Sequence, residues 1–401
     1  MNQLVKAGAI LFFLVLFLTF LVVGASLPRD SDDEMIYTAL AAKLQAQGPA
    51  GYNLRDVSIE SDGSFWKLEI RSPGNMLAGL RQSGVDYYDT GLFFNPPLFP
   101  AALSLSHALF SHTEPFLVLK RSASRNFHPE QIYLSFPNAC AAIFFLAGVY
   151  RLAKRFASEK IAALAALFCL TSPVFLVTVF KTWTDLLAAG LLVWSFNVWR
   201  TKERGTVHAA LAGILFGMAV LTRTSSFLAG VIFLGKRGRD SAIWFLAALL
   251  VSGVWFYKMY AVYGNPFFFP QAAHAQETLA WMKVIRREWY FYLYDIFYLC
   301  PVFLLVFWAF KKETAVLGWW IAVFLGALSA VIYSDRPLGL EDRYLLPSYP
   351  AWAILAALGY EKLKTRIPRR LLTVLVTAGL IWSLHIALPL IHSRESLKFI
   401  P

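Results

Sequence analysis

The feature that most constrains this chain is a series of long apolar runs separated by short basic segments. Hydrophobic residues make up 58% of the 401 residues, whereas charged residues make up only 15%. A run of about 20 apolar residues is long enough to cross the hydrocarbon core of a bilayer as a helix, and soluble domains do not carry such runs repeatedly. The sequence therefore predicts an all-α polytopic membrane protein.

Eleven apolar runs are expected to cross the membrane as helices. They cover residues 7–25, 132–150, 159–179, 184–199, 207–221, 225–235, 241–262, 290–310, 314–333, 344–361 and 371–391. The runs 207–221 and 225–235 are shorter than the roughly 20 residues that a span needs. They either both cross the membrane or form a shallow hairpin or a single broken helix. The first run is longer than the core of a secretory signal peptide, and we interpret it as an uncleaved span.

The charges of the connecting segments indicate how the chain is oriented. Short loops rich in lysine and arginine lie on the cytoplasmic side of a membrane, and with a cytoplasmic N-terminus every internal loop is short and basic. These loops contain Arg151, Lys154, Arg155 and Lys160; Arg200, Lys202 and Arg204; Lys236, Arg237 and Arg239; Lys311 and Lys312; and Lys362, Lys364, Arg366, Arg369 and Arg370. We therefore expect an inner (cytoplasmic) membrane protein with an external C-terminus. Orientation also accounts for the net charge of +12, so we expect no nucleic-acid partner.

The chain is interpreted as one transmembrane domain over residues 1–401 with two long external loops. The loops cover residues 26–131 and 263–289, and the first is too small and irregular to have an independent core. A helical stretch is expected around 275–289 in the second loop. The cysteines Cys140, Cys169 and Cys300 lie in apolar segments at spacings that predict neither a structural disulfide nor a metal site.

The first external loop is expected to contain several short elements. A helix is predicted at 33–47 and a small hairpin within 51–72, where apolar and polar residues alternate. The apolar run 98–110 is too short to cross the membrane, so it is read as a helix lying in the outer interface. Residues 113–130 are expected to form an outward-facing basic connector; its basic residues are Lys120, Arg121, Arg125 and His128.

An acidic segment follows the first apolar run directly. Between Leu27 and Tyr37 the chain carries four acids within five residues. Ser31 and Glu34 have the spacing of a capping box, and acids suit the positive end of a helix dipole, so helix capping alone explains the segment. The functional alternative is that one carboxylate, Asp33, is a general base held just outside the bilayer. Both interpretations can hold together.

Five short motifs occur in order along the chain, and each is weak by itself. They are Asp33-Glu34-x-x-Tyr37; Pro96-Pro97-Leu98; Trp183-Thr184-Asp185; Leu221-Thr222-Arg223-Thr224; and Asp342-Arg343-Tyr344 before Leu346-Pro347-Ser348-Tyr349-Pro350. Over residues 10–360 this order resembles the C-type-fold (GT-C) glycosyltransferases that use polyprenyl-phosphate sugars. That superfamily includes protein O-mannosyltransferases and the lipid A aminoarabinose transferase.

The resemblance implies a reaction and a set of partners. A sugar would move with inversion from a polyprenyl-phosphate carrier to an acceptor hydroxyl on the outer face of the membrane. The partners would be the lipid-linked sugar donor, membrane lipid, and an acceptor glycan, lipid or protein that the sequence does not identify. By similarity, Asp33 would deprotonate the acceptor hydroxyl, and Asp32, Glu34, Tyr37 and Asn95 would support or orient the reactants.

The resemblance also assigns residues to the carrier phosphate. Arg343 matches an arginine expected to bind it, a role that suits a guanidinium group, and Arg223 and Lys181 are further candidates. The two arginines also have plainer interpretations. Arg343 is equally a basic residue that flanks a span, and Arg223 is equally a side chain that extends to the membrane surface.

Dependence on a divalent metal ion stays open at this stage. Asp185 would orient donor or acceptor or help to hold a metal, and it is equally suited to cap the helix that follows it. Glu34 and His274 are the other candidate ligands, although a lone loop histidine is usually not a ligand.

This chain departs from the aminoarabinose branch just before the interfacial helix. That branch has an acid and a lysine where Phe94 and Asn95 stand here. Asp86 and Asp89 lie nearby and either replace the missing groups or belong to an ordinary solvated loop.

Two other classes of function compete with the transferase. A transporter or flippase of lipid-linked sugars would also need basic residues and aromatics, but it predicts charges near mid-membrane and internal symmetry. The polar residues of this chain gather instead at the outer ends of the spans. The remaining alternative is a non-catalytic protein of envelope assembly.

Overall fold

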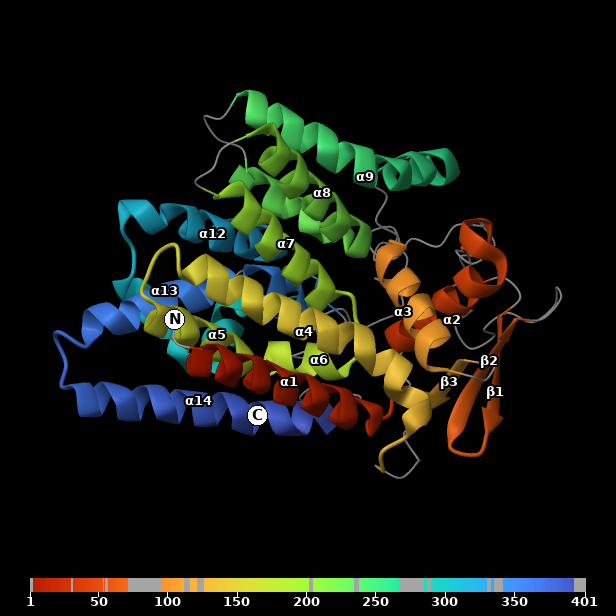
Figure 1. Cartoon of the computed structure of the whole chain (residues 1–401), viewed down its shortest axis with the longest axis horizontal. Helices are drawn as coiled ribbons and strands as arrows, with labels where there is room; N and C mark the ends of the chain where they lie inside the picture. Colours follow the sequence, from red (N-terminus) through yellow and green to blue (C-terminus); the bar gives the residue numbers. More distant parts are fainter. Residues whose placement is uncertain are drawn as a thin grey trace. The chain divides into compact units, whose positions relative to one another are not determined.

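The structure is a computed structural model of the whole chain (Figure 1). It describes residues 3–29, 32–52, 54, 57–70, 96–111, 116–120, 126–201, 205–233, 238–264, 266, 285–286, 290–329, 333–334 and 342–392. The chain divides into two compact units. The first comprises residues 1–143, 179–187 and 253–280, and the second comprises residues 144–178, 188–252 and 281–401.

The first unit contains the elements that flank the acidic segment. They are α1 (Gln3–Ala25), α2 (Asp32–Gln47), η1 (Gly48–Gly51), β1 (Val57–Asp62), β2 (Phe65–Ile70), α3 (Leu98–Phe110), β3 (Phe116–Leu119), η3 (Pro129–Gln131) and the start of α4 (Ile132–Ala153). Helix α2 packs on α3 and on strands β2 and β3. The expected helix at 33–47, the hairpin within 51–72 and the helix at 98–110 are all present.

The small sheet of the first unit has three antiparallel strands in the order β1-β2-β3. Gly63 turns the chain between β1 and β2 with φ of +45°, a conformation that side-chain-bearing residues rarely adopt. The pairing of Leu68 with Phe116 and of Phe65 with Leu119 adds β3 to the edge of β2. This strand was not expected, because its partner is distant in the sequence and its four residues show little periodicity.

The position of Lys120 corrects the prediction of an outward-facing connector. Lys120 follows β3 and is buried, and its ammonium donates hydrogen bonds to the Ser61 hydroxyl and, at 2.8 Å, to the Gly63 carbonyl. The same group lies 5.1 Å from the centre of the Trp66 ring. Lys120 therefore ties the hairpin turn to the end of β3. Arg121 and Arg125 lie outside the described residues.

The second unit contains the remaining helices. They are α5 (Glu159–Leu170), α6 (Pro173–Phe180), α7 (Asp185–Trp199), α8 (Thr206–Thr222), η4 (Thr224–Phe233), α9 (Arg239–Tyr263), α11 (Phe291–Leu299), η5 (Pro301–Trp308), η6 (Lys312–Thr314), α12 (Ala315–Ser329), η7 (Asp342–Ser348), α13 (Tyr349–Leu363) and α14 (Arg369–His392). Helices α4, α6, α7 and α9 contribute residues to both units. Helix α13 is the buried centre of the second unit, where it packs on α5 and η5. A Cβ at Gly359 would lie 1.9 Å from the Leu305 carbonyl oxygen, so this close approach requires glycine.

Two of the expected spans are sharply bent in the structure. Helices α5 and α6 meet at 63°, and α11 and η5 meet at 108°. Each break lies directly before a proline, Pro173 or Pro301, which lacks the amide that would continue the helix.

Every expected run contains a helical segment, but the count of eleven spans is not confirmed. Among the described residues, three helices are long and apolar enough to cross a membrane, or up to five if each bent pair is one span. The three cover Pro129–Ala153, Arg239–Ala261 and Arg369–Ile391. Exposed apolar side chains on α14, such as Leu371, Val374 and Ile381, suit contact with lipid. The chain is a membrane-embedded protein by these features.

Most of the second external loop lies outside the described residues. Within it, Ile285 and Arg286 form the short strand β4, which pairs antiparallel with β5 (Tyr333–Ser334). At these two residues the prediction of a helix around 275–289 is wrong. All three cysteines are free, and whether residues 1–401 form one functional domain stays a prediction.

His107 of α3 is a buried histidine that the packing holds neutral. It is 2% exposed, and its ring stacks on Phe116 with centroids 3.7 Å apart. Its Nδ1 lies 3.0 Å from the side-chain oxygen of Gln45, so the tautomer that donates from Nδ1 fits this contact. Its Nε2 is buried and has no hydrogen-bond partner among the described residues. Burial lowers the pKa of His107 to about 4.

We expect the first unit to lose stability as the pH falls from 6.5 to 4. The unfolded chain binds a proton at His107 in this range and the folded chain does not, so acid favours unfolding. The difference between the ordinary pKa and about 4 corresponds to at most about 3 kcal/mol. Thermal unfolding of the detergent-solubilised protein at several pH values measures the effect.

The variant His107→Phe keeps a stacked ring that cannot titrate and should lose less stability in acid than the wild type. His208→Phe, at a half-buried histidine of α8, should keep the wild-type profile. Equal acid sensitivity of His107→Phe and the wild type would contradict this account.

Candidate active site

The turn between α1 and α2 is organised by Arg29, whose side chain is fully buried. Its Nη1 donates to the Leu134 carbonyl and to the Thr182 hydroxyl, each at 2.8 Å. Its Nη2 donates to the Gly24 carbonyl at 3.1 Å and to the Ser135 hydroxyl at 3.0 Å. One guanidinium group thus joins the end of α1, the start of α4 and the segment before α7.

Glu34 completes a second contact with the same threonine. It is 1% exposed, and its Oε1 accepts a hydrogen bond from the backbone amide of Thr182 at 2.8 Å. Burial lowers the pKa of Arg29 to about 10, and the charge of Glu34 opposes this shift, so the guanidinium stays protonated at neutral pH. Buried charges are tolerated when they have hydrogen bonds and an opposite charge nearby. Arg29 and Glu34 therefore hold Thr182 by its hydroxyl and its amide.

The segment between α6 and α7 is buried around Thr182. Asn138 of α4 donates a hydrogen bond from Nδ2 to the Lys181 carbonyl. Lys181 is 8% exposed, and Asp185, the first residue of α7, is fully buried. Asp185 lies in the first turn of α7, where a carboxylate suits the positive end of the helix dipole, and both its capping role and its catalytic role stay predictions. The structure thus brings Lys181 and Asp185 onto one fixed segment that Glu34 contacts.

Asp33 lies in the first turn of α2 and is half-buried. Tyr37, one turn later, is buried and packs edge-on against Phe99 of α3 with ring centroids 5.6 Å apart. Asp32 begins α2, but its side chain lies outside the described residues, as does Ser31 of the expected capping box. The first turn of α2 is held in place by the buried Glu34 and Tyr37, so the backbone that carries Asp33 is fixed.

The two arginines expected to bind phosphate, Arg223 and Arg343, meet at one aromatic ring in the second unit. The Cζ atom of Arg223 lies 4.3 Å, and that of Arg343 5.3 Å, from the centre of the Tyr344 ring. Arg223 is half-buried at the end of α8, where its Nε donates to the Ser225 hydroxyl at 3.2 Å. Arg343 is 8% exposed. Two guanidinium groups thus share one aromatic ring, and their role toward a phosphate stays a prediction.

The described side chains do not form a metal site of their own. They include no group of three or more His, Cys, Asp or Glu side chains that could hold a metal ion. Of the candidate ligands, Glu34 uses one oxygen for the Thr182 amide, and His274 lies outside the described residues together with Asn95, Asp86 and Asp89. Glu34 and Asp185 alone would leave most of the positions around Mg²⁺ or Ca²⁺ to substrate and water.

Sequence reasoning missed Arg29 and Thr182. Arg29 lies within the acidic segment between Leu27 and Tyr37, but its role depends on carbonyl and hydroxyl groups more than 100 positions away. The sequence does contain one indication: Arg29 stands directly after a span and Pro28, in a chain where charges are few. Thr182 carries no such indication.

No protein-family model and no curated protein matches the sequence. The fold, in contrast, is similar to several solved structures. ArnT from Cupriavidus metallidurans in the apo state aligns with a TM-score of 0.60 at 15% identity, covering 99% of this chain and 67% of that one. The apo oligosaccharyltransferase of Archaeoglobus fulgidus aligns with a TM-score of 0.55 at 11% identity, over 96% of this chain and 57% of its own. The arabinofuranosyltransferase AftD from Mycobacteria aligns with a TM-score of 0.55 at 16% identity.

This chain spans only 28% of AftD. Other structures of these proteins contain ligands, namely ArnT bound to undecaprenyl phosphate, and the archaeal enzyme with Zn and sulfate or with an inhibitory peptide and a dolichol-phosphate. These proteins share the GT-C fold, so the fold expected from the five motifs is confirmed. At such low identity the likeness establishes the fold and leaves the roles of individual residues as predictions.

Replacing Arg29 by Gln is expected to lower the free energy of unfolding by about 3–5 kcal/mol, the usual cost of breaking a buried charge pair. The change removes four hydrogen bonds and the positive charge beside Glu34. Denaturant unfolding in detergent measures the loss. Arg200→Gln, at an exposed arginine, is the control and should change stability by no more than about 0.5 kcal/mol.

The double variant Arg29→Gln, Glu34→Gln should be more stable than the sum of the single losses predicts, because neither charge is then left buried alone. Strictly additive losses would show that the two charges do not interact.

Proposed function

We propose that this chain, which has the fold of the GT-C glycosyltransferases, transfers a sugar from a polyprenyl-phosphate carrier to an acceptor hydroxyl. The transfer inverts the sugar and takes place at the outer face of the membrane. The observation that carries the proposal is the likeness to ArnT along 99% of the chain. Structures of ArnT and of the archaeal oligosaccharyltransferase with polyprenyl phosphates support the class of donor.

The acceptor hydroxyl is a poor nucleophile and needs a base. Asp33 is the proposed base, because it is half-buried on a fixed turn and its carboxylate can meet an incoming hydroxyl. Arg29 and Glu34 act through Thr182 as positioning residues, since their hydrogen bonds fix the segment next to α2. Tyr37, Asp32 and Asn95 keep the supporting roles that the resemblance implies.

The leaving group is a carrier phosphate, and its departure leaves negative charge to be stabilised. Arg223 and Arg343 are proposed to bind that phosphate, because both guanidinium groups already gather at Tyr344. Lys181 is a further candidate. Asp185 is proposed to orient donor or acceptor from the start of α7.

Inversion follows from a single displacement at the anomeric carbon. The acceptor oxygen attacks as Asp33 removes its proton, and the bond to the phosphate oxygen breaks on the opposite face, through a transition state with oxocarbenium character. No covalent sugar–protein intermediate forms. The outer face is supported by the basic loops, which the distribution of charge places in the cytoplasm.

The proposal is tested by incubating the purified protein with a panel of labelled polyprenyl-phosphate sugars and candidate acceptors. Release of carrier phosphate together with a labelled acceptor is the expected result. Movement of the intact lipid-linked sugar across a vesicle membrane, without release, would instead indicate a transporter.

The variant Asp33→Asn is expected to lose turnover by about 10²- to 10⁴-fold, the usual contribution of a general base, with donor binding retained. Asp240→Asn is the matched control, because Asp240 also lies in the first turn of a helix, α9. Its turnover should equal that of the wild type. Wild-type turnover of Asp33→Asn would remove Asp33 from the mechanism.

The variant Arg343→Ala is expected to bind the donor about 10- to 150-fold more weakly, the range for a lost hydrogen bond to a charged group. Arg223→Ala should have a similar effect, because both groups share the ring of Tyr344. Binding of a labelled polyprenyl phosphate in detergent measures the affinity. Arg366→Ala, at an exposed arginine after α13, should bind normally, and unchanged affinity of folded Arg343→Ala would refute the phosphate role.

A further inference from the structure

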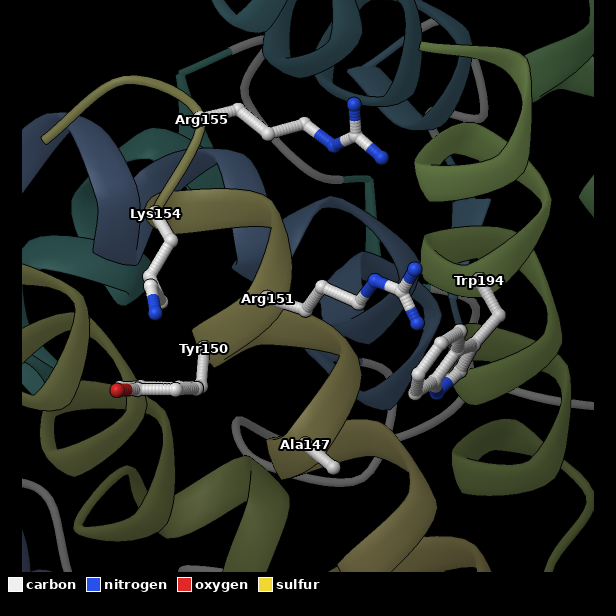
Figure 2. Close-up of a pocket in the computed structure, with 6 residues that line it drawn as sticks. All are labelled: Ala147, Tyr150, Arg151, Lys154, Arg155 and Trp194. Atoms are coloured by element: carbon white, nitrogen blue, oxygen red, sulfur yellow. The ribbon is translucent and has the colours of Figure 1, made fainter. Parts of the chain in front are cut away.

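A basic pocket lies at the C-terminal end of α4, in the second unit. It has a volume of about 440 Å³ and is lined by Ala147, Tyr150, Arg151, Lys154, Arg155 and Trp194. Figure 2 shows the three cationic side chains extending from the end of α4, with Arg151 directed toward Trp194 of α7. The pocket shares no residue with the proposed catalytic groups.

Aromatic side chains hold two of the cations. The Cζ atom of Arg151 lies 5.3 Å from the centre of the Trp194 ring, and the ammonium of Lys154 lies 5.7 Å from that of Tyr150. Trp194 is itself fixed, because its Nε1 donates to the Phe144 carbonyl at 2.7 Å and its ring stacks on that of Phe144. The pocket therefore has a built aromatic wall.

Arg155 also lines the pocket, and its guanidinium donates hydrogen bonds to the protein itself. It donates from Nη1 to the Arg200 carbonyl at 2.6 Å and from Nη2 to the Asn197 carbonyl at 2.8 Å, at the end of α7. Burial and the positive charges of Arg151 and Arg200 lower its pKa. Arg155 thus adds positive charge while it fixes the pocket to α7.

The pocket carries an excess of positive charge. Lys154 forms an ion pair with Glu159 at 2.6 Å, and this carboxylate balances one of the three cations. Arg151 is exposed, and among the described residues it has no hydrogen bond or ion pair. Its donors remain available to an anion, in the planar arrangement that suits phosphate oxygens.

We propose that this pocket binds the phosphate of an anionic phospholipid head group. The α4 helix is long and apolar enough to span the membrane, so its end lies near the membrane surface, where Tyr and Trp side chains are enriched. The charge distribution places this end on the cytoplasmic side. Basic pockets between helices at that side bind acidic head groups, and a volume of 440 Å³ falls within the usual range for small ligands of about 300–1,000 Å³.

The test uses full-length protein in vesicles of phosphatidylcholine that contain a minor fraction of photoactivatable phosphatidylglycerol. After irradiation, mass spectrometry measures the yield of crosslinks to residues 144–157. Arg151→Gln and Lys154→Gln should each lower this yield about fivefold, the value expected for the loss of one charge near a membrane surface. Arg151→Lys should keep most of it.

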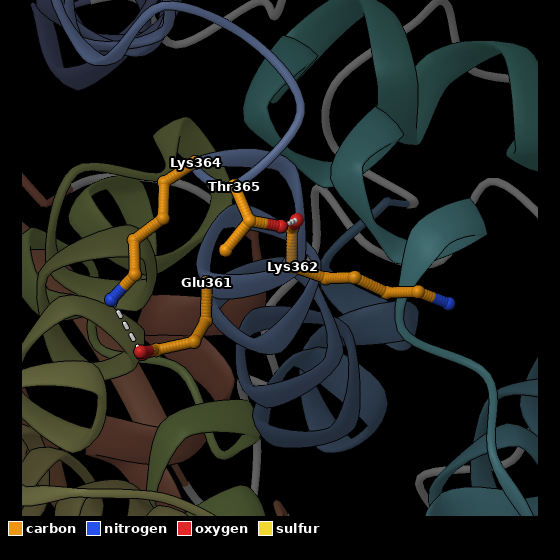
Figure 3. Close-up of polar contacts among 4 residues, drawn as sticks. All are labelled: Glu361, Lys362, Lys364 and Thr365. Carbon is orange, nitrogen blue, oxygen red and sulfur yellow. Dashed lines mark hydrogen bonds and ion pairs between the residues drawn. The ribbon is translucent and has the colours of Figure 1, made fainter.

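The end of α13 offers a matched control. Lys364 pairs with Glu361 there, as Figure 3 shows, and both side chains are about as exposed as those of the Lys154–Glu159 pair. Lys362 points away from this pair, and Thr365 donates to the Lys362 carbonyl at 2.7 Å. Lys364→Gln removes one positive charge on the same expected side of the membrane without touching the pocket, so crosslinking at residues 144–157 should stay unchanged.

Two results would overturn the proposal. One is that folded Arg151→Gln and Lys154→Gln crosslink as well as Lys364→Gln does, which would show that the pocket does not select the lipid. The other is that millimolar inorganic phosphate abolishes crosslinking, whereas a sulfate-free control solution of matched salt concentration leaves it unchanged. That result would assign the pocket to a soluble phosphate. Crosslinking that is retained in inorganic phosphate supports a phospholipid head group as the ligand of the pocket.

Discussion

The burial of Arg29 is the constraint on which the first unit depends. A guanidinium group removed from water destabilises the fold unless its donors and its charge are satisfied. Here carbonyl and hydroxyl groups of α1, α4 and Thr182 accept its hydrogen bonds, and Glu34 supplies the opposite charge. The position of Glu34 in turn fixes the first turn of α2, and therefore Asp33. The placement of the proposed base follows from this charge pair.

The sequence predicts local elements well where a single physical cause sets them. The helix at 98–110 begins after Pro96 and Pro97 and has the bounds of α3. The two sharp bends were not predicted, although proline explains both of them. Strand β3 could not be predicted in the same way. It exists because the open edge of β2 needs a partner, and the partner is chosen by tertiary packing rather than by the residues of β3 alone.

For the candidate site, too, the sequence predicts local features but not the contacts between distant residues. Charges that stand out in an apolar chain are visible in the sequence, so Asp33, Arg223 and Arg343 could be selected as candidates. The sequence does not show which of them meet. Arg223 and Arg343 lie far apart in the chain and converge on Tyr344 only in the folded unit, and the contact of Arg29 with Thr182 has the same origin. Pairing over long sequence separations depends on how the helices pack.

The hydrogen bonds of each arginine distinguish a structural role from a binding role. Arg29 uses both Nη atoms on protein acceptors and is fully buried, so its side chain is not accessible to a substrate. Arg155 likewise donates to the end of α7. Arg151 is exposed and lies over a fixed tryptophan, which orients its guanidinium while leaving its donors to an outside partner. An arginine that is held by an aromatic ring rather than by acceptors is prepared for an anion, and Arg151 is such a residue.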